Sequence, residues 1–144
     1  MSSSVPTPED IFRRVADGIP RLMAGDLAQV EALTALYADP TSVSHPLLHG
    51  YPTLVSRADV RRHFEETRRR ASGLRFQAQE IRIHQTADPE VIVAEFTYRG
   101  AGPAGPLTAH CIFVWRVRNG LIVEARDYID YAAFGRAVRR AATP

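Results

Sequence analysis

The sequence predicts an α+β fold in which three N-terminal helices are followed by a curved antiparallel sheet of about four to six strands and a short C-terminal helix. Apolar residues in the first half of the chain recur at the three- and four-residue spacing of amphipathic helices. From Leu74 to Ile129, β-rich segments are separated by turn residues. Helices and strands segregated in this way are typical of an α+β domain.

Three helices are expected before the sheet. The first begins at Thr7-Pro8-Glu9-Asp10, which supplies an N-cap residue, a proline at the first helical position and acids in the first turn. Gly18 and Pro20 are expected to kink or split this helix. A second helix follows Gly25-Asp26 and ends at Pro40.

The middle of the chain predicts a short strand, a loop and the third helix. Thr41–His45 is the candidate strand, and the loop from Pro46 to Pro52 is rich in turn-forming residues. Ser56-Arg57-Ala58-Asp59 resembles a capping box at the start of the third helix, which Gly73 ends.

Four longer strands and a last helix complete the prediction. Asp88-Pro89 and Asn119-Gly120 are hairpin-type turns, and Gly100–Pro106 is a longer connection. The expected strands are Leu74–Thr86, Val91–Arg99, Leu107–Arg118 and Leu121–Ile129, and the expected last helix is Tyr131–Ala142. We therefore expect a flexible tail at residues 1–7 and a single domain at residues 8–142.

Composition narrows the classes of function. The chain has 144 residues, a formal net charge of +2 and one cysteine, Cys111, which excludes an intrachain disulfide. No apolar run approaches the ~20 residues of a membrane span, and the N-terminus lacks the pattern of a secretory signal, so we expect a cytoplasmic protein. The histidines lack metal-ligand spacing, so neither a metal nor another cofactor is expected.

An arginine cluster between Arg57 and Arg70 raises the question of nucleic-acid binding. Glu65 and Glu66 interrupt it, and no aromatic residues alternate with the arginines to stack on bases. We interpret the cluster as a solvated helix face and expect no nucleic-acid partner.

Asp127 stands where its strand calls for an apolar residue. Successive side chains of a strand point to opposite faces, so Asp127 shares a face with Val123, Ala125 and Ile129. A carboxylate on an inward face is costly to bury, and the expected response is a raised pKa, which is frequent at functional sites. The structural alternatives are an aspartate that caps the following helix or pairs with an arginine.

The order of elements and several local sequences resemble the nuclear transport factor two-like superfamily, also called the cystatin-like α+β fold. The resemblance covers roughly residues 8–140. It rests on Ala35–Asp39, Arg57–Phe64 and Asn119–Ile122, and on the end of the chain, where Arg126–Asp130, Phe134 and Ala137-Val138 are similar to limonene epoxide hydrolase. It implies a conical cavity and a homodimer formed through the outer face of the sheet.

The resemblance also implies a role for Asp127. The matching acid is catalytic in limonene epoxide hydrolase, and an acid at this place serves acid–base chemistry in SnoaL-like cyclases and the phenazine-biosynthesis proteins. The rest of the hydrolase set is missing, because Phe96 and Tyr98 stand at its arginine and aspartate, and Val43 and His45 at its tyrosine and asparagine. The catalytic aspartate that ketosteroid isomerase carries on its first strand is not visible either.

The predicted site is a mostly apolar pocket with one carboxyl, one imidazole and one phenol. The candidate catalytic residues are Asp127, His45 and Tyr98, with Asp127 as acid or base and His45 or Tyr98 donating to an enolate oxygen. The candidate substrate-binding residues are Val43, Phe64, Phe96, Ala109, Cys111, Phe113, Ile129 and Phe134.

Two hypotheses of different class follow. One is a cofactor-free isomerase, cyclase or lyase acting on a small apolar carbonyl compound. The presence of one acid and one histidine in the predicted pocket favours it, since a wholly apolar pocket would suit binding alone. The other is a non-catalytic domain that binds an apolar ligand or a partner. An epoxide hydrolase-like enzyme with altered catalytic residues is a third reading. Glu95 is expected on the outer face of the sheet, where Arg116, Arg126, His110 or Trp115 would join it in a dimer interface.

Overall fold

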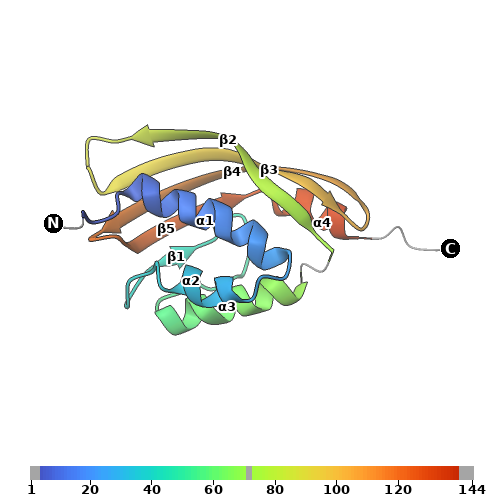
Figure 1. The fold of residues 1–144 in the computed structure, drawn as a ribbon, viewed down its shortest axis with the longest axis horizontal. Helices are drawn as coiled ribbons and strands as arrows, with labels where there is room; N and C mark the ends of the chain where they lie inside the picture. The colour runs from blue at the N-terminus through green and yellow to red at the C-terminus, as the bar shows by residue number, and fades with distance from the viewer. Residues whose placement is uncertain (1–3, 71–72, 140–144) are drawn as a thin grey trace.

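The computed structural model describes residues 4–70 and 73–139 as one layer of helices packed on a curved sheet (Figure 1). The helices are α1 (Pro8–Met23), α2 (Ala28–Thr34), α3 (Arg57–Arg70) and α4 (Tyr131–Val138). The strands are β1 (Val43–Ser44), β2 (Arg75–Gln85), β3 (Val91–Gly102), β4 (Gly105–Arg118) and β5 (Leu121–Ile129). The predicted α+β class and the order of elements are confirmed. The last helix ends at Val138, with Arg139 extended, and residues 140–142 of the expected Tyr131–Ala142 helix lie outside the described part.

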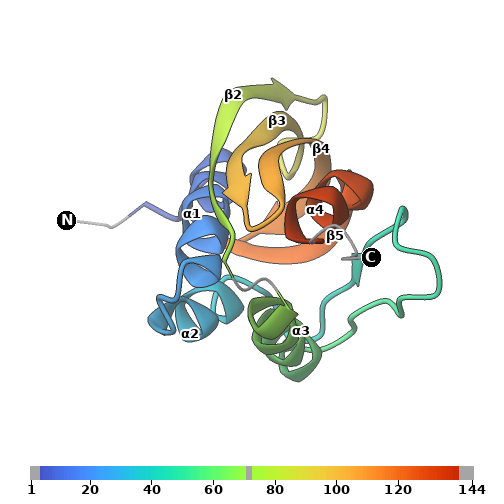
Figure 2. The same cartoon turned by 90° about the vertical axis from the view of Figure 1, so that its right-hand side faces the viewer.

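The sheet has the order β1-β5-β4-β3-β2 and is antiparallel except at one edge. There β1 pairs with β5 in parallel, with Val43 opposite Ala125 and Ser44 opposite Arg126. Seen from the end, the long strands curl over, with α1 and α4 lying against the sheet and α3 beneath it (Figure 2). This curvature creates a concave face with room for a cavity.

Helix α1 begins as its sequence predicts but continues further. Thr7 N donates to Asp10 Oδ2 at 2.9 Å and Asp10 N donates to Thr7 Oγ1 at 3.1 Å, which is a capping box. The expected split at Gly18 and Pro20 is wrong, because the helix runs unbroken to Met23. A side chain at Gly18 would place Cβ 2.7 Å from Leu33 Cδ2, so glycine allows α2 to pack closely against α1.

Both hairpins at β4 are tight. The Asn119-Gly120 turn is confirmed, and both residues have the positive φ, 52° and 74°, that suits a two-residue hairpin turn. The longer connection expected at Gly100–Pro106 is wrong. Gly102 pairs with Gly105, so the strands continue to a turn at Pro103-Ala104.

The core forms between α1 and the concave face of the sheet. The ring of Phe12 packs edge-on against Phe96, Phe113 and Trp115, with centroids 5.2, 6.1 and 5.8 Å apart. Trp115 is only 1% exposed, so its suggested place in an outer interface is wrong. It points inward because it lies on the same face of β4 as Phe113.

A bulge adjusts which residues of β5 face inward. Arg116 pairs with Glu124 and Val117 with Ile122, which leaves Val123 as the extra residue. Ile122 and Ala125 are therefore buried, in place of the expected Val123 and Ala125. The alternation beyond the bulge then holds, and Asp127 faces the core.

The outer face of the sheet is polar, and Glu95 lies on this face as expected. This side chain is exposed and contacts His84 across the β2–β3 pair. His110 contacts Thr97 on the same face. Ile112 is an exposed apolar side chain among them. A homodimer through this face stays a prediction.

Gly100 of β3 is expected to tolerate no side chain. A Cβ there would lie 1.9 Å from the Arg75 carbonyl oxygen and 2.6 Å from Phe76 Cα, both backbone atoms of β2. Gly100→Ala should lower the free energy of unfolding in urea by about 2 kcal/mol or more. Gly135→Ala is the control, because its Cβ meets only Arg139 Nη2 at 4.0 Å and alanine should raise helix stability by up to about 1 kcal/mol. Equal effects of the two changes would contradict this packing.

Candidate functional site

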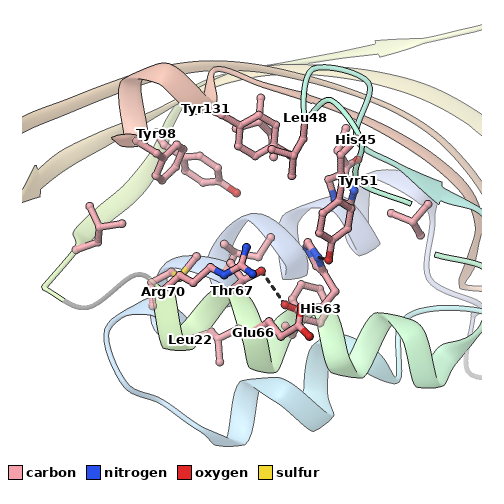
Figure 3. A pocket seen from close by; sticks show the side chains of 18 of the residues that line it. Leu22, His45, Leu48, Tyr51, His63, Glu66, Thr67, Arg70, Tyr98 and Tyr131 are labelled. Atoms are coloured by element: carbon pink, nitrogen blue, oxygen red, sulfur yellow. Dashed lines mark hydrogen bonds between the residues drawn. The ribbon is translucent and has the colours of Figure 1, made fainter. Parts of the chain in front are cut away.

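A cavity of about 360 Å³ lies between the concave face of the sheet and helices α1, α3 and α4. Figure 3 shows its wall, with Tyr98, Tyr131 and Leu48 on one side and Arg70, Thr67 and Glu66 of α3 on the other. Its volume is in the range of small-molecule sites. Most of the wall is apolar: Ile19, Leu22, Met23, Val43, Leu48, Leu54, Val60, Phe64, Leu74, Phe76, Phe113, Ile129, Phe134 and Val138.

Asp127 is the one carboxyl deep in this wall, among the residues that the structure describes. It lies on β5 opposite Phe113 and is 7% exposed. Its Oδ1 accepts a hydrogen bond of 2.7 Å from Trp115 Nε1. Burial raises the pKa of Asp127 to about 7, and the indole hydrogen bond opposes that shift. It neither caps α4, which Asp130 does, nor pairs with an arginine among the described contacts.

Three phenols share the cavity wall with this carboxyl. Burial raises the pKa of Tyr37, Tyr98 and Tyr131, and the nearby charge of ionised Asp127 raises each further. All three therefore stay protonated and keep an O–H to donate at neutral pH. The Tyr98 hydroxyl is buried without a hydrogen-bond partner and points into the cavity (Figure 3).

A second polar group of the wall consists of His45, Tyr51 and His63. The His45 and His63 rings stack with centroids 4.7 Å apart, and Tyr51 meets each ring edge-on. Tyr51 Oη and His63 Nδ1 share a hydrogen bond of 2.7 Å. His45 follows β1, the edge strand that pairs with β5, and lines the same cavity as Asp127.

The structure brings most of the predicted site residues to one cavity. Those that line it are Asp127, His45, Tyr98, Val43, Phe64, Phe113, Ile129 and Phe134. Phe96, Ala109 and Cys111 are buried in the packed core instead. Phe12 of α1 covers Phe96, and α4 packs on β4, the strand that carries the other two. Burial raises the pKa of the Cys111 thiol to about 12, so it stays protonated.

Several polar residues of the wall were not predicted as site residues from the sequence, namely Tyr37, Tyr51, His63, Glu66, Thr67, Arg70 and Tyr131. His63 had a usable signal, because it lies three residues after Val60 and next to Phe64 on the inward side of α3. Tyr51 had none, because it lies in a loop without periodicity.

Neither a metal cluster nor a membrane helix is found in the described ranges. Across residues 4–70 and 73–139, no three side chains of His, Cys, Asp or Glu come together as a metal site. In the same part of the chain, no helix is long and apolar enough to cross a bilayer.

The fold and the cavity agree with the comparison with protein families. The model of the SnoaL-like domain matches residues 13–125. The chain belongs to the SnoaL-like domain family. No curated protein matches it.

Several solved structures have a similar fold at low sequence identity. A candidate isomerase from Bacillus subtilis is 21% identical, with a TM-score of 0.64 over 90% of this chain and 99% of its own. A candidate polyketide cyclase from Pseudomonas putida is 17% identical, with a TM-score of 0.66 over 93% and 99%. An LEH-like epoxide hydrolase from M. tuberculosis is 22% identical, with a TM-score of 0.57 over 92% and 90%. At these identities the likeness establishes the shared fold.

The buried carboxyl predicts a specific pH dependence of stability. Below pH 3.8 Asp127 is protonated in both the folded and the unfolded chain. Between pH 3.8 and about 7 the unfolded chain releases a proton that the folded chain keeps, so the free energy of unfolding falls as pH rises, by about 4 kcal/mol in total. Asp127→Asn should remove this fall.

Urea unfolding of both proteins at several pH values between 4 and 8 measures the effect. The difference between wild type and Asp127→Asn isolates Asp127, because the buried histidines contribute to both proteins. A difference that does not change with pH would contradict a buried carboxyl of raised pKa.

Proposed function

We propose that this SnoaL-like protein is a cofactor-free isomerase or cyclase that transfers a proton on a small apolar carbonyl compound. The observation that carries the proposal is the Asp127 carboxyl, whose pKa of about 7 lets it both take and return a proton near neutral pH. The apolar wall suits an apolar substrate and keeps water from the carboxyl.

The roles follow from the hydrogen bonds. Trp115 occupies Oδ1 of Asp127, so the proton would transfer at Oδ2. Asp127 as the carboxylate takes a proton from the carbon next to the carbonyl group, and the unpartnered Tyr98 hydroxyl donates to the oxygen on which negative charge develops. His45, which lines the same cavity, is the alternative donor.

Two outcomes of the enolate are possible in such a site. Protonated Asp127 returns its proton to a different carbon, which completes an isomerisation. Alternatively, the enolate carbon attacks a second carbonyl carbon of the same molecule, the π bond of that carbonyl breaks as the ring closes, and protonated Asp127 gives its proton to the alkoxide oxygen that forms. Both need only the acid–base pair and a cavity that folds the substrate.

Epoxide hydrolysis is less well supported. The positions of the hydrolase arginine and aspartate are occupied by Phe96 and Tyr98, and Phe96 is buried outside the cavity wall. In the described wall, the other charged side chains are Glu66 and Arg70 of α3. A water-activating set like that of the hydrolase is therefore lacking around Asp127.

Asp127→Asn should abolish proton transfer without closing the cavity. Deuterium exchange from D₂O into an enolisable ketone such as 2-tetralone, followed by NMR, reports proton abstraction without knowledge of the natural substrate. Wild type should accelerate exchange, with a rate that rises with pH and levels off above about 7, because the base is the carboxylate. The Asn variant should lose about 10²–10⁴-fold of the rate.

Ligand binding provides the control for this experiment. Asn keeps the shape of the side chain and can still accept from Trp115 Nε1, so the affinity for 2-tetralone should change by less than about tenfold. Tyr98→Phe should slow exchange with a smaller loss. If ketones bind in the cavity and neither wild type nor Asp127→Asn accelerates exchange, the chain is a binding domain and not this enzyme.

A further inference from the structure

Three aromatic side chains that carry ring nitrogens or a hydroxyl meet at one side of the cavity. His45 follows β1, Tyr51 lies in the loop after it, and His63 lies on α3. All three line the same cavity as Asp127 and Tyr98, and Figure 3 shows them facing it together. Acid–base chemistry at Asp127 uses neither Tyr51 nor His63, so the cluster calls for an explanation of its own.

The cluster is uncharged at neutral pH. Burial lowers the pKa of His45 to about 4 and that of His63 to about 3, and the charges of His45 and Arg70 also lower the latter. Burial raises the pKa of Tyr51. The charged side chains that act on the cluster, Asp59, Arg62, Glu66 and Arg70, come from α3 and include both signs.

One polar atom of the cluster is left without a partner. His45 is 6% exposed, and its Nδ1 is buried and makes no hydrogen bond. Within residues 4–70 and 73–139, the other buried side-chain atom of this kind is the hydroxyl oxygen of Tyr98, in the wall of the same cavity. A buried polar atom without a hydrogen bond carries its full desolvation cost, and an occupant that supplies the bond removes that cost.

The chemistry of that occupant follows from the ring nitrogen. A hydroxyl group can donate to the nitrogen or accept from it, so it suits either tautomer of a neutral imidazole. The stack with His63 and the edge of Tyr51 hold the His45 ring in place, and the Tyr51–His63 hydrogen bond holds those two rings. A carboxylate at His45 would lose its hydration against uncharged rings, and Glu66 opposes the positive charge of Arg70 at this side of the wall, so its binding is unfavourable.

We propose that His45, Tyr51 and His63 form a second polar subsite, which binds an uncharged hydroxyl or carbonyl oxygen of the ligand. The ligand is then an uncharged, mostly apolar molecule with two oxygen functions, one at Tyr98 and one at His45. This deepens the proposed function by naming its substrate class, and it rests on that function only for the assignment of the carbonyl group to Tyr98.

Binding of matched naphthalene probes tests the subsite without turnover. 2-Naphthol carries one hydroxyl, 2,6-dihydroxynaphthalene adds a second, and 6-hydroxy-2-naphthoate puts a carboxylate in its place. Wild type should bind the diol about fivefold more tightly than 2-naphthol, the size of one added neutral hydrogen bond. It should bind the carboxylate more weakly than 2-naphthol.

Variants assign the preference for the diol to His45. His45→Phe keeps an aromatic ring for the stack but removes the nitrogen, so the diol and 2-naphthol should bind equally. His84→Phe is the matched control, because His84 lies on the exposed outer face of the sheet and should leave the preference unchanged. Tyr51→Phe, at a partly exposed loop position, should reduce the preference, and it serves if His45→Phe does not fold.

The outcomes separate this proposal from the proposed function. In Asp127→Asn the diol preference should persist while deuterium exchange is lost, because the subsite does not use the carboxyl. Equal binding of diol and 2-naphthol by wild type, a preference that survives both His45→Phe and Tyr51→Phe, or tighter binding of the carboxylate would each overturn the second subsite. Each of these results leaves the exchange experiment to decide the role of Asp127 separately.

Discussion

The carboxyl of Asp127 is held in an apolar wall by one hydrogen bond, from the indole of Trp115. Such burial is costly for an ionised group, and two features of the site reduce that free-energy cost. The carboxyl keeps its proton up to about pH 7, and the indole satisfies one of its oxygens. Much of the surrounding architecture fixes these two side chains, since the bulge in β5 turns Asp127 inward and Phe12 holds Trp115 against the sheet.

The cavity has a consistent electrostatic character beyond that carboxyl. The phenols that share the wall with Asp127 remain protonated, while the imidazoles of His45 and His63 remain neutral. The wall therefore offers hydrogen bonds and almost no fixed charge apart from α3, whose Glu66 and Arg70 belong to it. A site of this kind favours an uncharged ligand. It can transfer a proton between the carboxyl and the ligand with few charged side chains nearby, which agrees with acid–base chemistry on a carbonyl compound.

The sequence predicted the strand alternation well enough to find Asp127, because a polar residue on an inward face breaks a strict two-residue period. The same two-residue period could not predict that Phe113 lines the cavity while Phe96 and Cys111 lie in the packed core. All three face the same side of the sheet, and only the placement of α1 and α4 decides which are covered by helix and which line the cavity. Local rules also failed at Gly18 and Pro20, where the helix runs unbroken and Gly18 lies against Leu33 of α2. Tyr51 was beyond sequence reasoning, since loops carry no period.

The most direct measurement is the pKa of the Asp127 carboxyl in the folded protein. A ¹³C NMR titration of the side-chain carboxyl, assigned by comparison with Asp127→Asn, gives it in the absence of any ligand. The account predicts a midpoint near 7, well above the ordinary value of 3.8. A midpoint at or below about 4 would mean a solvated or ion-paired carboxylate, and would contradict a buried acid that transfers protons at neutral pH.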